Sequence, residues 1–143
     1  MRQDDPHWVV AILDGRGTML LARLALASAY IVGGLTKLLD FSRAVAEQEH
    51  FGLYPGWIWA GLTIVVELIG SFLVVSGRFV WLGAGALGVL TFVAMIVAND
   101  FWDMKGAAQF QATNAFFEHL GLIGGFVLVA HLSAHTSRQT SSV

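Results

Sequence analysis

A glutamate stands near the middle of a long apolar stretch of the sequence. Glu67 lies within WIWAGLTIVVELIGSFLVVSG, residues 57–77, where no other side chain is charged. A charge at the centre of a bilayer costs at least about 2.5 kcal/mol on insertion scales, so such a residue normally has a partner or a function. A carboxylate in this position can hold or transfer a proton, which makes Glu67 a candidate catalytic residue.

Three further ionisable side chains lie in or beside apolar runs. Arg23 lies in the first run, Lys37 follows its end, and His119 lies in the last run. At 1.5 Å per residue, Glu67 and Arg23 are about 14 Å and about 8 Å from the same face of the membrane. We therefore expect an ion pair between Arg23 and Glu67. The catalytic candidates are Glu67, His119 and Lys37.

A second group of polar residues is expected near the opposite membrane face. The depths of Lys37 and His119 are similar there, and the other members come from neighbouring connections. We expect one polar cavity open to this face, lined by Lys37, His50, Asp100, Trp102, Glu118 and His119. Two plainer interpretations stay open: a buried ion pair can serve only to fix helix register, and side chains near an interface can extend into water.

The residue types available in the sequence limit which cofactors this chain can bind. His50 with His119 is the one combination near this face for a bis-histidine haem, and we do not expect haem there. The sequence contains no cysteine, which removes disulfides, thiolate metal sites and iron–sulfur clusters supplied by this chain. We expect no metal site and no intrinsic cofactor, with a bound quinone as the candidate ligand.

The elements that must position these residues are membrane-spanning helices. Of 143 residues, 56% are hydrophobic and 13% charged, against roughly 25% charged in a soluble domain. Four apolar runs, each close to the ~20 residues that cross a bilayer, predict four spans. These runs cover residues 18–36, 57–77, 79–98 and 115–132. We predict an all-α, membrane-embedded four-helix bundle.

The connections complete the expected organisation. The segment DFSRAVAEQEHFGLYPGW predicts a short interfacial helix between the first and second spans. Residues 1–17 form an N-terminal interfacial lead, residues 18–132 the transmembrane domain, and residues 133–143 a flexible C-terminal tail. The distribution of Lys and Arg favours cytoplasmic termini. A net charge of −2 gives no argument for nucleic acid as a partner.

Four segments of the sequence resemble the DoxX family, small bacterial four-helix membrane proteins of the inner membrane. They are ARLALASAYIVGGLTKLLDF, VVELIGSFLVVSGR, NDFWD and NAFFEHLGLIGGFVLVA, and they span about residues 18–132. The family residues that the resemblance carries over are Arg23, Lys37, Glu67, Asp100 and Trp102. This chain departs from the family pattern at Glu118 and His119, where a Lys-Asn pair is frequent, and this departure weakens any anion site there.

The resemblance implies a role in membrane oxidoreductase assemblies, since relatives form part of a thiosulfate to quinone oxidoreductase. The first hypothesis is therefore a quinone-linked membrane subunit that acts with a partner redox protein or as a homo-oligomer. A second is a non-catalytic accessory subunit that packs against a larger respiratory or photosynthetic complex. The third is a carrier of a small anion or metabolite that uses Arg23 and Lys37 as binding charges.

Overall fold

The protein is a set of helices joined by short turns. The structure, a computed structural model, describes residues 6–98 and 101–140, with side chains through residue 135. Within this part of the chain the helices are α1 (His7–Leu13), α2 (Arg16–Leu39), α3 (Phe41–His50), α4 (Gly56–Ser76), α5 (Val80–Ala98) and α6 (Gly106–Thr140). Four of them, α2, α4, α5 and α6, are long and apolar enough to cross a membrane. The predicted all-α architecture with four spans is confirmed.

The last helix is longer than the sequence indicated. α6 begins at Gly106 rather than at residue 115 and continues through Thr140. Residues 107–114 contain Ala and Gln, which favour helix, and residues 126–140 contain neither Gly nor Pro to end it. The segment 133–140, predicted as part of a flexible tail, therefore extends α6. At 1.5 Å per residue this helix exceeds the ~30 Å hydrocarbon layer, so it tilts or extends beyond the lipid.

The four spans share one core at the end of the molecule where α4 turns into α5. α4 packs between α2 and α5, α6 packs along α5, and α2 meets α6 over a shorter stretch. At that meeting the rings of Tyr30 and Phe126 lie edge to face with centroids 5.4 Å apart. The buried core residues are Tyr30, Val74, Val80, Ala84, Leu87, Phe126 and Val129.

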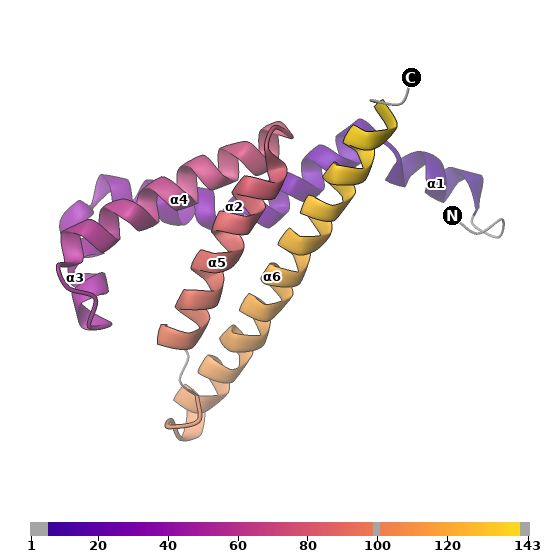
Figure 1. The fold of residues 1–143 in the computed structure, drawn as a ribbon. Helices are drawn as coiled ribbons and strands as arrows, with labels where there is room; N and C mark the ends of the chain where they lie inside the picture. The colour runs from indigo at the N-terminus through magenta and orange to yellow at the C-terminus, as the bar shows by residue number, and fades with distance from the viewer. Residues whose placement is uncertain (1–5, 99–100, 141–143) are drawn as a thin grey trace.

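Figure 1 shows that the spans form two pairs, α2 with α4 and α5 with α6. The pairs come together beside the turn between α4 and α5 and diverge toward α3 on one side and the start of α6 on the other. The four spans therefore lie closer together at one end of the bundle than at the other.

The predicted interfacial helix forms as α3 and covers the start of α4. The Asp40 carboxylate caps it by accepting from the Arg43 backbone N–H at 3.1 Å, the usual role of Asp before a first turn. Ala44 and Gln48 are buried, and α3 packs against α4. Gly56 permits this contact, because a Cβ there would lie 2.8 Å from the Val45 carbonyl oxygen.

Candidate functional site

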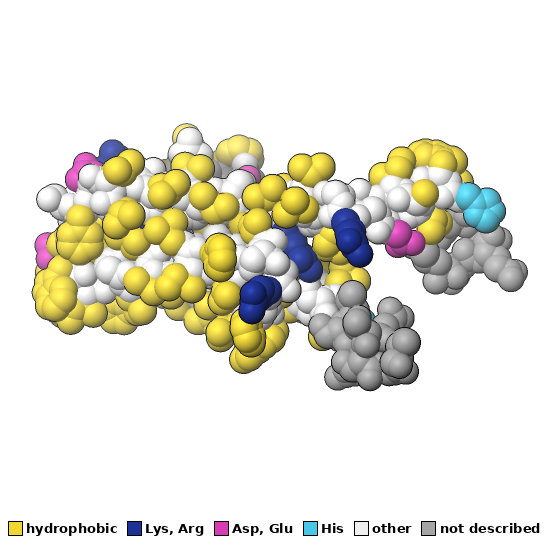
Figure 2. Space-filling view, turned by 90° about the horizontal axis from the view of Figure 1, so that it is seen from above, with side chains coloured by type: hydrophobic (Ala, Val, Ile, Leu, Met, Phe, Trp, Pro, Cys, Tyr) yellow, Lys and Arg dark blue, Asp and Glu magenta, His cyan; other side chains and the backbone are white. Residues whose placement is uncertain are grey.

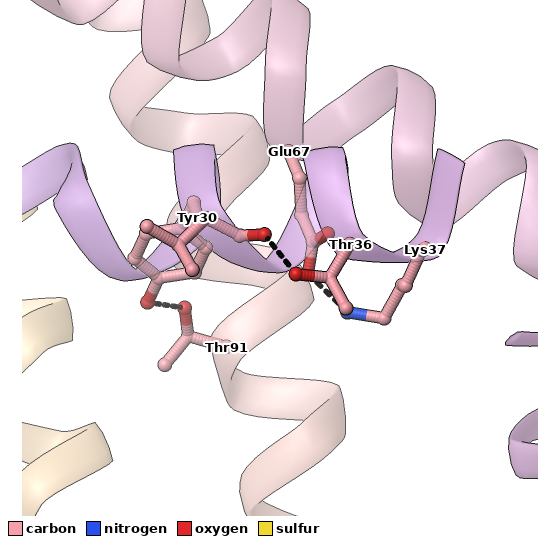
Figure 3. A network of polar contacts seen from close by, with 6 residues as sticks. Tyr30, Thr36, Lys37, Glu67 and Thr91 are labelled. Atoms are coloured by element: carbon pink, nitrogen blue, oxygen red, sulfur yellow. Dashed lines mark hydrogen bonds and ion pairs between the residues drawn. The ribbon is translucent and has the colours of Figure 1, made fainter. Parts of the chain in front are cut away.

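A single buried ion pair joins α2 to α4. Lys37 Nζ lies 2.8 Å from Glu67 Oε1, and the two side chains are 18% and 9% exposed. It is the one salt bridge between side chains of the described residues. Figure 3 shows the lysine reaching along α2 to the carboxylate. Charge-assisted hydrogen bonds of this length are among the stronger polar contacts in proteins.

The predicted pairing of Arg23 with Glu67 is wrong. Arg23 Nη2 donates instead to Ser133 Oγ of α6 at 3.0 Å, and its guanidinium lies beside Gly77 at the end of α4. Side chains on a helix lean toward its N-terminus. For Lys37 this direction leads back along α2 toward Glu67, whereas for Arg23 it leads away from Glu67 toward the start of the helix.

Two adjacent glycines bring α2 close to Glu67. A Cβ on Gly34 would lie 2.8 Å from Leu68 Cδ2 and 3.2 Å from Glu67 Cβ, so the helices cross there at short range. A Cβ on Gly33 would lie 3.5 Å from both Glu67 carboxylate oxygens and 3.6 Å from Lys37 Nζ. The crossing thus places the backbone of α2 directly over the ion pair.

An open-sided cavity of about 240 Å³ lies beside the pair, between α2 and α3, and its surface is mostly apolar although charged side chains take part in the lining. Its lining consists of Gly33, Thr36, Lys37, Asp40, Arg43, Ala44 and Glu47. Gly33 and Lys37 belong both to this lining and to the surroundings of Glu67, so the cavity leads to the ion pair. Glu67 Oε2 is buried and makes no hydrogen bond, which leaves a carboxylate oxygen able to accept a further proton donor.

A second polar chain lies in the same layer of the bundle. The Tyr30 hydroxyl is 2.5 Å from Thr91 Oγ1, and Thr91 Oγ1 donates to the Leu87 carbonyl oxygen at 2.6 Å. A threonine hydroxyl has one proton, so Tyr30 is the donor in the first bond. Figure 3 shows this chain beside Glu67, on the side away from Lys37. The hydrogen bond between Tyr30 and Thr91 joins α2 to α5, as the ion pair joins α2 to α4.

The expected outer cavity is not assembled as predicted, because of its five members within the described residues only Lys37 lines the observed cavity. His50 is exposed and its ring meets that of Phe51 edge to face, and His119 Nδ1 contacts the Ala115 carbonyl oxygen of its own helix. Trp102 and Glu118 are exposed. Asp100 lies outside the described residues.

The sequence analysis missed the other groups near the ion pair, which are Tyr30, Thr91, Asp40, Arg43 and Glu47. The sequence does contain a pattern that links Asp40 with Arg43, since an Asp commonly caps a helix by accepting from the backbone N–H three residues later. Tyr30 carried one as well, because it lies one helical turn before Gly33 and so shares a face with it. Within the described residues, no three His, Asp or Glu side chains are grouped as a metal site requires.

Four apolar spans, a capped connecting helix and a buried carboxylate define an integral membrane protein of the helical class. The family model described as DoxX matches residues 18–100, and the chain belongs to this family. The match covers α2 to α5 and leaves α6 outside. The chain is 26% identical over 112 residues to the inner membrane protein YphA of Escherichia coli (strain K12), covering 78% of this chain and 80% of YphA. No solved structure gives a significant match.

Proposed function

We propose that this chain is the inner-membrane subunit of a quinone-linked redox assembly, and that the cavity beside Lys37 and Glu67 receives the quinone ring. The observation that carries the proposal is that Lys37, which lines the cavity, is paired with the buried Glu67, one of whose carboxylate oxygens has no hydrogen-bond partner among the described residues. An inner-membrane location is supported by the similarity to YphA, which is described as an inner membrane protein.

Quinone chemistry needs the groups that this site holds. Reduction of a quinone to a quinol consumes two electrons and two protons, so the site requires a hydrogen-bond donor for the quinone oxygens and a proton carrier. The Lys37 ammonium supplies the donor, and the Glu67 carboxylate supplies the carrier. The electrons come from a partner redox protein, because the chain has no cysteine with which to bind an iron–sulfur cluster.

The dimensions of the cavity favour the ring rather than a whole quinone. At about 240 Å³ it is smaller than the roughly 300 to 1,000 Å³ typical of pockets for drug-sized ligands. An isoprenoid tail therefore lies outside it, along the lipid-facing surface. Gly33 keeps the route between the cavity and the ion pair free of a side chain.

Retention of quinone by the purified chain tests the binding half of the proposal. We expect the protein, isolated in a mild detergent, to retain quinone that chromatography of a solvent extract detects. Lys37→Met should lower the retained amount roughly tenfold or more, since a hydrogen bond from a charged donor contributes about 1.5 to 3 kcal/mol. Lys105→Met, at an exposed lysine outside the spans, is the matched control and should change nothing.

Complementation tests the catalytic half. In membranes that lack the chain, Glu67→Gln should restore the amount of the redox assembly but not its quinone-dependent turnover. Normal turnover with Glu67→Gln, together with a loss of assembled complex when the chain is absent, would favour the accessory role instead. If the wild-type chain retains no more quinone than Lys37→Met, the proposed quinone site is ruled out.

A further inference from the structure

Three arginines lie together at the closely packed end of the bundle, far from the ion pair. Arg16 begins α2, Arg23 follows seven residues later, and Arg78 lies in the turn between α4 and α5. We call the surface formed by these three residues the arginine end. Figure 2 shows basic side chains gathered in this region, beside the turn between α4 and α5.

Among the described residues, the groups that contact the Arg23 guanidinium are neutral. Its Nη2 donates to Ser133 Oγ at 3.0 Å, and a Cβ on Gly77 would lie 2.6 Å from its Nη1. Its Nε is buried and has no hydrogen-bond partner in the part of the chain that the structure describes. Glu67 is paired with Lys37, and no carboxylate of the described residues forms a salt bridge with any of the three arginines.

The three guanidinium groups can reach a similar depth along the bundle axis. Residues seven apart lie on nearly the same face of a helix, with about 10.5 Å between them along its axis. The Arg23 side chain leans toward the start of α2 and reaches Gly77, the residue before Arg78. The arginine end is therefore a concentration of positive charge where α2, α4 and α6 meet, at the boundary of the apolar layer.

An apolar groove begins beside these charges. It lies between α5 and α6, has a volume of about 440 Å³, and extends from Trp81 and Ala130 to Phe92 and Ile123. Trp81 is three residues after Arg78, and Ser133, the partner of Arg23, is three residues after Ala130. Gly85 and Gly88 line the groove, and a Cβ on either would meet nothing within 4 Å.

We propose that the arginine end binds the phosphate of an anionic phospholipid and that the groove between α5 and α6 holds one of its acyl chains. A guanidinium presents paired donors that match phosphate oxygens. Basic pockets between spanning helices are established sites for anionic head groups. A positive head site that continues into an apolar groove matches a ligand that is itself half anionic and half hydrocarbon.

The test measures thermal unfolding of the full chain in a neutral detergent with added lipid. We expect dioleoyl phosphatidylglycerol to raise the midpoint in a saturable way, and neither dioleoyl phosphatidylcholine nor inorganic phosphate at equal concentration to do so. Arg23→Gln and Arg78→Gln should each weaken the apparent affinity about fivefold, following the contribution of one arginine near an anionic lipid surface. Lys105→Gln, at an exposed basic residue outside the spans, is the matched control.

Two features keep the test decisive. Arg23 also joins α2 to α6, so the exposed Arg78 provides a variant that leaves this contact intact. Gly85→Leu fills the groove without touching the arginines and should weaken phosphatidylglycerol binding. Equal shifts with both lipids, an effect of Lys105→Gln as large as that of Arg78→Gln, or a full response to inorganic phosphate would each overturn the proposal.

Discussion

Glu67 depends on Lys37 because, without the lysine, its carboxylate would be a buried charge with no partner. The lysine keeps 18% of its side chain exposed and faces the cavity, while the carboxylate keeps 9%. Attraction within such a pair mainly offsets the cost of taking the charges out of water. Removing one residue of the pair therefore destabilises the protein chiefly because the charge on the other residue is left unpaired.

Removing one partner should destabilise the protein more than removing both. We expect Lys37→Met to lower the free energy of unfolding by about 3 kcal/mol, the lower end of the range for broken buried pairs. The double variant Lys37→Met with Glu67→Gln should recover most of this loss, because no charge is left unpaired. Chemical unfolding in detergent compares the wild type, Lys37→Met, Glu67→Gln and the double variant, and additive effects of the two changes would show that the pair is not coupled.

The bond between Tyr30 and Thr91 predicts an unequal response at its two ends. Thr91→Val leaves the Tyr30 hydroxyl buried without its acceptor and should cost about 1 to 3 kcal/mol. Tyr30→Phe leaves Thr91 still donating to the Leu87 carbonyl oxygen and should cost about 1 kcal/mol. Unfolding midpoints of the two variants give the comparison, and a larger loss for Tyr30→Phe would reverse the assigned direction of the bond.

Among the elements, α4 and α5 approach most closely at glycines. A Cβ on Gly83 would lie 2.6 Å from the Gly70 carbonyl oxygen, which is backbone and cannot turn aside. A Cβ on Gly70 would lie 2.9 Å from Leu87 Cγ. Small residues at such a crossing let spanning helices pack backbone to backbone.

Two glycines of α5 form a matched test of this packing. Gly83→Ala should destabilise the protein by about 1 to 3 kcal/mol, because the added methyl group forces α4 and α5 apart. A Cβ added at Gly85 would meet no atom within 4 Å. Gly85→Ala should therefore be neutral or stabilise the protein by up to about 1 kcal/mol, since Ala favours helix over Gly. Thermal unfolding in detergent compares them, and equal losses would mean that the close approach does not limit stability.

For the whole molecule, four spans place the start of α2 and the end of α6 on the same side of the membrane. The arginine end then lies on the side with more Lys and Arg, which is usually cytoplasmic. The cavity beside Lys37 lies toward the other side, near α3. Redox chemistry and lipid binding are thus proposed for opposite ends of the bundle.

Single cysteines test this orientation directly, because the native sequence contains none. Asp103→Cys, in the segment between α5 and α6, should react in intact cells with a maleimide that does not cross membranes. Ser76→Cys, at the end of α4, should react only after the membrane is opened. Both residues are exposed, so a difference reports sidedness rather than burial. The opposite labelling pattern would reverse the orientation.

Local sequence properties were sufficient for the helical framework. The length and composition of the apolar runs predicted α2, α4 and α5 closely, and the polar segment after Leu39 predicted α3. These features depend on short stretches of chain, since a run of about 20 apolar residues has few alternatives to a spanning helix. The ends of α6 differ from the predicted ones because the polar residues that flank its apolar run are compatible with helix and do not end it.

The sequence by itself determined that a carboxylate would be buried in a membrane helix and would need a partner. Only the tertiary structure decided that the partner is Lys37 rather than Arg23. The difference arises where α2 crosses α4 at Gly33 and Gly34, and from the lean of side chains toward the start of a helix. Depth along a helix can be counted from residue numbers, but the rotation of one helix against another depends on the packing of the whole bundle.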